Sequence, residues 1–136
     1  MDLASKVVDK MLRGDAFSKW LGIEILAISS GYCKLKMKVR KEMTNGFDIA
    51  HGGITYSLAD SALAFAANSY GIQSLSVETS IKHTKKVMNG DTLIAETKEI
   101  EQKEKTASYV INIINQNGIE VAEFNGKVYI TKNYWF

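Results

Sequence analysis

A short glycine-containing segment begins the most chemically suggestive part of the sequence. Asn45 and Gly46 are followed, after four residues, by His51, Gly52 and Gly53, at the start of an alanine-rich run. The first N–H groups of a helix lack partners within it and carry partial positive charge, and glycine lets a ligand oxygen approach them. This pattern predicts a site that polarises a carbonyl or stabilises an oxyanion. Taken alone, the glycine pair is more typical of a tight entry turn than of a site, and a lone histidine is more often structural than catalytic.

An acidic residue, Asp60, lies inside the apolar run that follows, among Leu58, Ala59, Ala62 and Leu63. A carboxylate is rarely buried unless it is paired or functional, because losing its hydration is costly. Burial raises the pKa of a carboxyl group, which suits a general base or a nucleophile near neutral pH. The structural alternative is that Asp60 pairs with a lysine or caps a backbone group elsewhere in the fold.

The spacing between Gly52 and Asp60 limits how the two could act together. They are eight residues apart, which places them about 12 Å apart along one helix axis. A reacting carbonyl must lie within about 3 Å of both its hydrogen-bond donor and its attacking group. One helix cannot supply both, so a shared role requires Gly52 from one chain and Asp60 from another. The spacing therefore predicts an obligate homodimer with shared active sites.

The elements that position these residues follow from the hydrophobic periodicity. Residues 1–20 predict short amphipathic helices, and residues 53–70 predict a central helix that is buried all round, because small and apolar residues cover nearly its whole circumference. Between them, a hairpin is predicted on either side of the turn at 29–31. Its second strand, 33–40, alternates strictly, and its basic row is expected to be a solvated face: Lys34, Lys36, Lys38 and Arg40.

Four strand-like runs follow the central helix, at 73–82, 91–100, 106–114 and 120–131. Turns that contain Asn-Gly, at 89–91 and 115–118, form two of the three joins between these runs, which favours antiparallel neighbours. An apolar helix must be wrapped by something, and this sheet is the only candidate. The pattern predicts an α+β fold in which an antiparallel sheet wraps one helix.

Length and composition restrict the class of protein. A chain of 136 residues and 15.1 kDa buries about 68% of its extended surface, which supports one domain spanning 1–136. A formal charge of +2 argues against a nucleic-acid partner, and a lone Cys33 excludes a disulfide framework and a cysteine-built zinc site. The charged N-terminus resembles no secretory signal, and the longest apolar run contains Asp60. We therefore expect a cytoplasmic protein with no membrane partner.

Four segments carry a family resemblance. Residues 45–60 have the pattern Asn-Gly-x₄-His-Gly-Gly-x₄-Leu-Ala-Asp, and the others are 75–79, 89–93 and 121–129. Together they resemble hotdog-fold acyl-CoA thioesterases of the phenylacetate-degradation (PaaI-like) type, over nearly the whole chain from about residue 15. The resemblance implies a hotdog fold, with about six antiparallel strands around one long helix. It also implies dimers paired into homotetramers, with active sites at the subunit interface.

The resemblance implies a role for each residue of the site. Asp60 would be the general base or nucleophile, and the Gly52 N–H of the partner chain would polarise the thioester carbonyl. Asn45 would help to position the water or the carboxylate, and His51 would fix the loop and contact the thioester region. Ser76, on the strand after the helix, matches a position that hydrogen-bonds in the catalytic pocket of relatives.

The implied reaction is hydrolysis of an aryl- or medium-chain acyl-CoA to the free acid and CoA. Gly53 belongs to the implied substrate site, and Lys82, Lys85 and Lys86 are candidates for contacts with the phosphates of coenzyme A. A solvated strand end is the alternative for these lysines. Relatives commonly carry an Arg/Lys-Pro pair at this bend, whereas this chain contains no proline. No metal or redox cofactor is expected, and coenzyme A enters as part of the substrate.

Two other functions remain to be weighed. A hotdog hydratase or dehydratase usually pairs a loop histidine with a helix carboxylate, and dehydratases of fatty-acid synthesis carry a proline-bounded His-Phe-Pro element that is missing here. A non-catalytic acyl-CoA-binding or sensing module typically carries a DNA-binding helix-turn-helix, but only about twenty residues precede the first strand. The tail 134–136 is expected either to pack on a neighbouring subunit or to be disordered.

Overall fold

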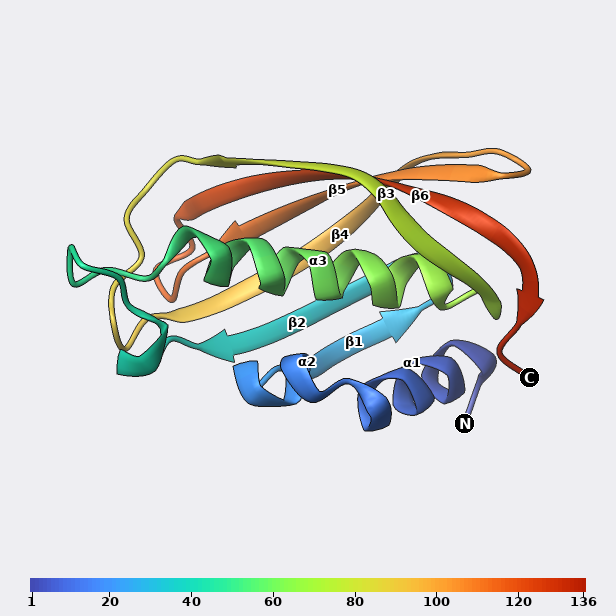
Figure 1. Cartoon of the computed structure of the whole chain (residues 1–136), viewed down its shortest axis with the longest axis horizontal. Helices are drawn as coiled ribbons and strands as arrows, with labels where there is room; N and C mark the ends of the chain where they lie inside the picture. Colours follow the sequence, from blue (N-terminus) through green and yellow to red (C-terminus); the bar gives the residue numbers. More distant parts are fainter.

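The computed structural model describes residues 1–136 and has an α+β architecture, with a long helix lying across one side of a curved sheet (Figure 1). The helices are α1 (Leu3–Gly14), α2 (Ala16–Leu21) and α3 (Gly52–Asn68), with a 3₁₀ turn, η1, at Lys41–Met43. The strands are β1 (Glu24–Ser29), β2 (Tyr32–Lys38), β3 (Ile72–His83), β4 (Thr92–Gln102), β5 (Thr106–Ile114) and β6 (Glu120–Tyr134). All six form one antiparallel sheet in the order β1-β2-β4-β5-β6-β3, which confirms the predicted fold class.

The short N-terminal helices are delimited by their caps. The Asp2 side chain accepts a hydrogen bond from the N–H of Ser5, and the Asp15 side chain accepts one from the N–H of Ser18, so each helix starts with one of its free donors satisfied. Helix α2 ends at Gly22, whose φ of 75° lies in the left-handed region that glycine adopts without strain. Both helices lie along the β1 side of the sheet (Figure 1).

Helix α3 is buried on the side that faces the sheet but not all round. Leu58, Leu63 and Phe65 are fully buried against the strands. A stripe on the opposite side is only half-buried: Tyr56, Ser57, Asp60, Ser61 and Ala64. The expectation of burial around the whole circumference is wrong for this stripe, because a single sheet covers only one side of the helix.

The C-terminal end of α3 comes two residues before the predicted position 70, for a local reason. The Asn68 side chain donates to the carbonyl of Ala64 and also exchanges hydrogen bonds with the backbone of Ser74, at 3.0 and 2.8 Å. Gly71 then turns the chain with a φ of 95°. These contacts bring the chain directly into β3.

Strand β3 lies at one edge of the sheet and pairs only with β6. Leu75 and Val77 on this edge are 65% and 60% exposed, which is unusual for large apolar side chains. Tyr56 of α3 makes a hydrogen bond to Thr79 of β3 and packs edge-on against Phe124, so β3 is held over the helix. An unpaired strand edge with apolar side chains is a surface suited to pairing with another strand.

The C-terminal tail is anchored within the chain rather than disordered. Strand β6 extends to Tyr134, beyond the predicted end at residue 131, because Tyr134 pairs with Ile72 at the start of β3. Trp135 donates its indole N–H to Asn68 Oδ1 at 2.9 Å, and its carbonyl accepts from Lys10 Nζ at 2.9 Å. The two termini consequently lie at the same end of the molecule (Figure 1). None of the helices has the length and apolar character needed to cross a membrane.

Candidate active site

A cavity of about 360 Å³ opens at the N-terminal end of α3. Asn45, Gly52, Lys85 and Lys86, all predicted site residues, line it together with His83. Two loops that are far apart in the sequence meet here, one leading into α3 and one following β3. The Ala50 N–H donates to the carbonyl of Val87 at 2.8 Å, which joins the two loops.

The loop before α3 is held by its own hydrogen bonds. The Asn45 side chain accepts from the N–H of Phe47 at 2.9 Å, and its backbone N–H donates to the carbonyl of Ile49 at 2.8 Å. The N–H of His51 donates to the carbonyl of Met43 at 2.8 Å. Because these bonds are local and short, the loop presents Asn45 in a defined position beside the start of the helix.

The first two N–H groups of α3 differ in whether they have a hydrogen-bond partner in the chain. His51 is the N-cap, and its Nδ1 accepts from the Gly53 N–H at 2.8 Å. The N–H of Gly52 donates to no group of the chain. It therefore remains available, at the positive end of the helix dipole, to a substrate oxygen.

His83 closes one side of this helix end, although the sequence reasoning assigned it no role. A Cβ atom on Gly52 would lie 3.3 Å from His83 Nε2, so a larger residue at position 52 would crowd the imidazole. Thr55 Oγ1 lies 3.4 Å from His83 Nδ1 and donates to the carbonyl of Gly52 at 3.0 Å. The sequence signal that could have indicated a role for His83 was its place among the lysines at the end of the predicted strand. For Thr55, the only signal was its position one turn after Gly52.

Asp60 lines a different cavity, of about 200 Å³, with Asp15, Phe17, Tyr56 and Ser61 among its neighbours. Burial raises the pKa of the Asp60 carboxyl group above its usual 3.8, and no hydrogen bond or nearby cation opposes that shift. The three ion pairs of the chain all involve other residues. The alternative in which Asp60 pairs with a lysine of its own chain is therefore wrong.

The remaining predicted residues lie apart from both cavities. His51 and Gly53 line a third cavity, of about 360 Å³, with Phe17 and Trp20. Ser76 and Lys82 lie on the exposed edge strand β3 and line none of the three cavities. Within one chain, the structure thus brings together the helix start and the lysine loop, but not the helix start and Asp60.

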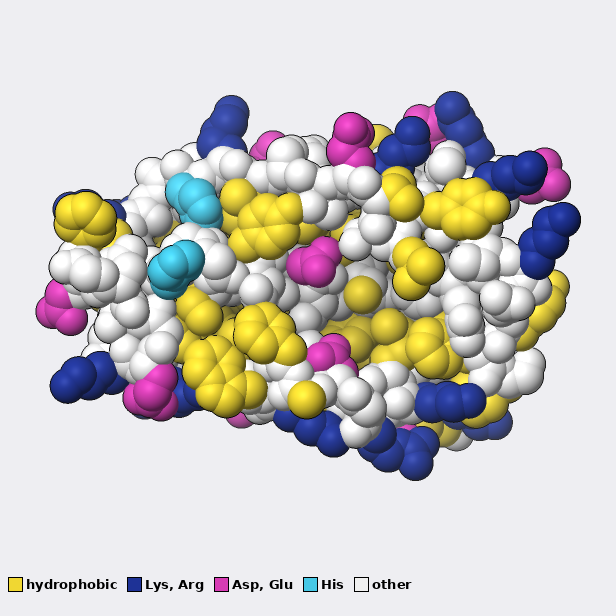
Figure 2. Space-filling model, viewed as in Figure 1, with side chains coloured by type: hydrophobic (Ala, Val, Ile, Leu, Met, Phe, Trp, Pro, Cys, Tyr) yellow, Lys and Arg dark blue, Asp and Glu magenta, His cyan; other side chains and the backbone are white.

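The sequence reasoning gave no functional role to two aromatic side chains on α2. Phe17 and Trp20 are 52% and 46% exposed, and their rings stack with centres 6.0 Å apart and an angle of 13° between planes. Phe17 lines both the Asp60 cavity and the His51 cavity. On the face that displays α3, hydrophobic side chains surround acidic ones, both histidines lie towards one end, and basic side chains lie around the rim (Figure 2).

Polar side chains also line the Asp60 cavity. The Ser18 hydroxyl donates to Asp15 Oδ2 at 2.6 Å and lies 2.8 Å from the Ser61 hydroxyl. The lining of this cavity therefore combines aromatic rings with hydroxyl groups. No group of three or more potential metal-ligating side chains occurs in the chain.

Similarity to known proteins identifies the family of this chain. Residues 47–122 match the family model described as the thioesterase superfamily. The acyl-coenzyme A thioesterase PaaI of Escherichia coli is 38% identical over 117 residues, which cover 86% of this chain and 84% of that protein.

Solved structures extend the similarity to the whole fold. The PaaI protein from the phenylacetic acid degradation operon of E. coli superposes with a TM-score of 0.94 at 35% identity, covering 96% of this chain and 95% of that one. A protein of Streptococcus pneumoniae, described as a hypothetical thioesterase and solved with coenzyme A, has a TM-score of 0.84 at 25% identity and covers 90% and 95% of the two chains. The chain therefore belongs to the thioesterase superfamily, as a hotdog-fold protein of the PaaI type.

Proposed function

We propose that this protein hydrolyses acyl-CoA thioesters to the free acid and coenzyme A. The observation that carries the proposal is the pair of unpaired groups on α3: the Gly52 N–H, which has no partner, and the Asp60 carboxylate, whose pKa is raised by burial. An unpaired donor suits a carbonyl oxygen that gains negative charge, and a carboxylate of raised pKa suits attack or base catalysis. The reaction named for E. coli PaaI is of the same kind.

The proposed chemistry assigns one role to each end of the helix. The Gly52 N–H binds the thioester oxygen, and Asp60 either accepts a proton from the attacking water or attacks the carbonyl carbon itself. The C–S bond then breaks, and the thiol of coenzyme A leaves with a proton. If Asp60 attacks directly, water hydrolyses the resulting anhydride and restores the carboxylate.

Both groups act at one site only if two copies of the chain associate. Gly52 and Asp60 belong to one continuous helix and line separate cavities, as the spacing argument requires. The edge strand β3, with Leu75 and Val77 exposed, is the surface through which we propose that a homodimer forms. Pairing there would bring a second α3 towards the half-buried stripe that contains Asp60.

The proposed substrate lies with its coenzyme at the lysine loop. Lys85 and Lys86 line the same cavity as Gly52, so phosphates held there would place the thioester near the helix start. Lys82 lies on β3 outside the cavity and would contact only the outer part of the coenzyme. The structure from S. pneumoniae was solved with coenzyme A, which supports this class of ligand.

The remaining groups have supporting roles in the proposal. Asn45 is positioned by its loop beside Gly52 and would orient the water or the partner's carboxylate. His51 caps the Gly53 N–H and would thereby hold the helix start in place. Ser76 would reach the site from the edge strand only across the dimer. The acyl group would be aryl or medium-chain, because Phe17 and Tyr56 line the Asp60 cavity.

The test is release of free thiol from a panel of aryl and aliphatic acyl-CoAs by the wild type and by Asp60→Asn. We expect turnover by the wild type and a loss of about 10³-fold or more in kcat in the variant, because the other carboxylate of this cavity, Asp15, is already bonded to Ser18. Asp48→Asn, at an exposed loop position, is the matched control and should keep full activity. Unchanged turnover in Asp60→Asn would remove Asp60 from the mechanism, and tight binding without turnover by the wild type would favour the sensing module.

A further inference from the structure

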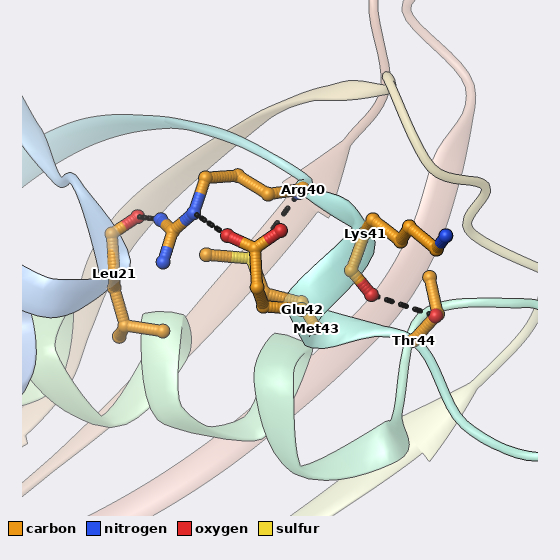
Figure 3. Close-up of polar contacts among 6 residues, drawn as sticks. All are labelled: Leu21, Arg40, Lys41, Glu42, Met43 and Thr44. Carbon is orange, nitrogen blue, oxygen red and sulfur yellow. Dashed lines mark hydrogen bonds and ion pairs between the residues drawn. The ribbon is translucent and has the colours of Figure 1, made fainter.

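Arg40 ends the basic row of the second strand, but its side chain is not a free solvated cation. Its Nη1 donates to the carbonyl of Leu21 at 3.4 Å, and its Nε bonds Glu42 Oε2 at 3.2 Å (Figure 3). Its guanidinium carbon lies 4.8 Å from the centre of the Trp20 ring. A planar guanidinium can stack on an aromatic ring while its N–H groups bond in the plane. Arg40 therefore ties the segment after β2 to α2.

Helix α2 needs such a contact to keep its orientation. It has six residues, fewer than an isolated helix requires for stability in water. Ser18 and Leu21 anchor its inner side, while Phe17 and Trp20 form an aromatic shelf on its outer side. Arg40 is the group from outside α2 that stacks on this shelf. Arg40 therefore supports the outer side of α2, whose inner side is already anchored.

The aromatic shelf lines two of the three cavities, although not the one that contains Gly52. Phe17 lines the cavity that contains Asp60, and both shelf rings line the cavity that contains His51. An aryl acyl group whose thioester carbon is attacked by Asp60 would extend about one ring length beyond that carbon, far enough to meet Phe17 in the same cavity. A two-carbon acyl group is too short to reach the shelf.

We infer that Arg40 is a positioning residue, which holds the aromatic shelf against bulky acyl groups and so sets a preference for them over short ones. The inference rests on the proposed function for its substrate, because the acyl group meets the shelf only if an acyl-CoA binds with its thioester beside Asp60. Arg40 itself touches neither Asp60 nor the Gly52 N–H, and its effect passes through Trp20 and Phe17.

The experiment compares KM and kcat for phenylacetyl-CoA and acetyl-CoA in the wild type, Arg40→Ala and Arg40→Lys. We expect Arg40→Ala to raise KM for phenylacetyl-CoA about five-fold, with kcat little changed and the acetyl-CoA parameters unaffected. The KM of Arg40→Lys for phenylacetyl-CoA should lie between those of the wild type and Arg40→Ala, because lysine keeps a cation near Trp20 but lacks the planar guanidinium group. Arg13→Ala removes the same charge from an exposed position on α1 and should match the wild type.

A spectroscopic readout reports on the shelf directly. The chain has two tryptophans, so Trp20 is the single fluorophore in a Trp135→Phe background. Arg40→Ala should lower the emission anisotropy of Trp20 without ligand, and circular dichroism verifies that the variant is folded. If Arg40→Ala unfolds the protein, the comparison of Arg40→Lys with the wild type carries the test.

Several outcomes would overturn the inference. Equal losses on both substrates would mean that Arg40 supports the loop before α3 rather than the acyl site, and an unchanged KM would mean that the shelf does not depend on it. If the wild type cleaves neither substrate, the proposed function fails, and binding measured by Trp20 fluorescence decides the inference. Tighter binding of phenylacetyl-CoA than acetyl-CoA that Arg40→Ala abolishes supports it; no such difference contradicts it.

Discussion

At the scale of single residues, the protein leaves two groups on α3 without a partner in the chain, and the partly buried one, Asp60, costs stability. The Gly52 N–H has no partner, and Asp60 is partly buried without a cation or a hydrogen bond. Residues used in catalysis often carry such a cost, because pairing them within the chain would satisfy the groups that the substrate must meet. His51 shows the contrast, since its side chain satisfies the adjacent Gly53 N–H and leaves Gly52 free.

The raised pKa of Asp60 predicts how stability changes with pH. A pKa raised by folding contributes stability below the unfolded value of 3.8, and this is lost as the pH rises through the folded pKa. At neutral pH, the ionised Asp60 therefore destabilises the fold, and Asp60→Asn should raise the Tm. Thermal unfolding followed between about pH 3 and pH 8 should show the difference growing with pH and then levelling off. Asp48→Asn should show no such trend; a parallel trend would contradict the explanation.

At the scale of the elements, the ends of α3 are fixed by contacts with distant parts of the chain. The N-terminal end meets the loop after β3, where Val87 binds Ala50, and the C-terminal end meets the tail through Asn68. Asn68 Oδ1 accepts from both the Ser74 N–H and the Trp135 indole, so one buried amide joins α3, β3 and the tail. A buried network of this kind keeps the helix in one register relative to the sheet.

Removing the indole donor tests the role of the tail. Trp135→Phe keeps an aromatic ring but replaces the indole and loses its hydrogen bond to Asn68, and we expect it to lower the free energy of unfolding by about 1 kcal/mol. Urea denaturation measures this loss, and hydrogen exchange should show faster exchange of the Ser74 and Gly71 amides. Tyr134→Phe, at an exposed neighbouring position, is the control. Equal stability of the two variants would show that the tail contributes only ring packing.

At the scale of the whole molecule, the single chain has one sheet and a helix that the sheet covers on one side. The uncovered stripe of α3 and the exposed edge of β3 lie on neighbouring parts of the same face, where hydrophobic side chains gather (Figure 2). Burial of such a surface is a large driving force for association. We therefore expect the proposed homodimer to be the active form.

Mixed dimers test whether sites are shared. If each site combines Asn45 and Gly52 of one chain with Asp60 of the other, a dimer of one Asp60→Asn chain and one Asn45→Ala chain contains one intact site. Mixing equal amounts of the two inactive variants, with refolding to exchange chains, should restore about a quarter of the wild-type activity. Mixing Asp60→Asn with itself is the control. If activity stays at the level of the separate variants, both residues act from the same chain.

Particular residues show which features of the structure the local sequence pattern predicted and which it did not. The alternation of apolar and basic residues correctly placed β2, and the alanine-rich run correctly placed α3, because these signals depend only on neighbours along the chain. The same run located Asp60 and the glycine turn. Local patterns could not show whether these groups have partners. The pairing of Asp60 with a lysine was excluded only by the structure, which has no cation beside its carboxyl group.

What the sequence by itself determined was the type of fold, the helix that carries Gly52 and Asp60, and the distance that separates them on it. The tertiary structure alone decided which side of α3 the sheet leaves open, that His83 faces Gly52, and that Arg40 lies over Trp20 rather than in solvent. The physical reason is the strand order β1-β2-β4-β5-β6-β3, which takes β3 across the sheet to its far edge. Contacts of this kind depend on the packing of segments far apart in the chain, which no local periodicity encodes.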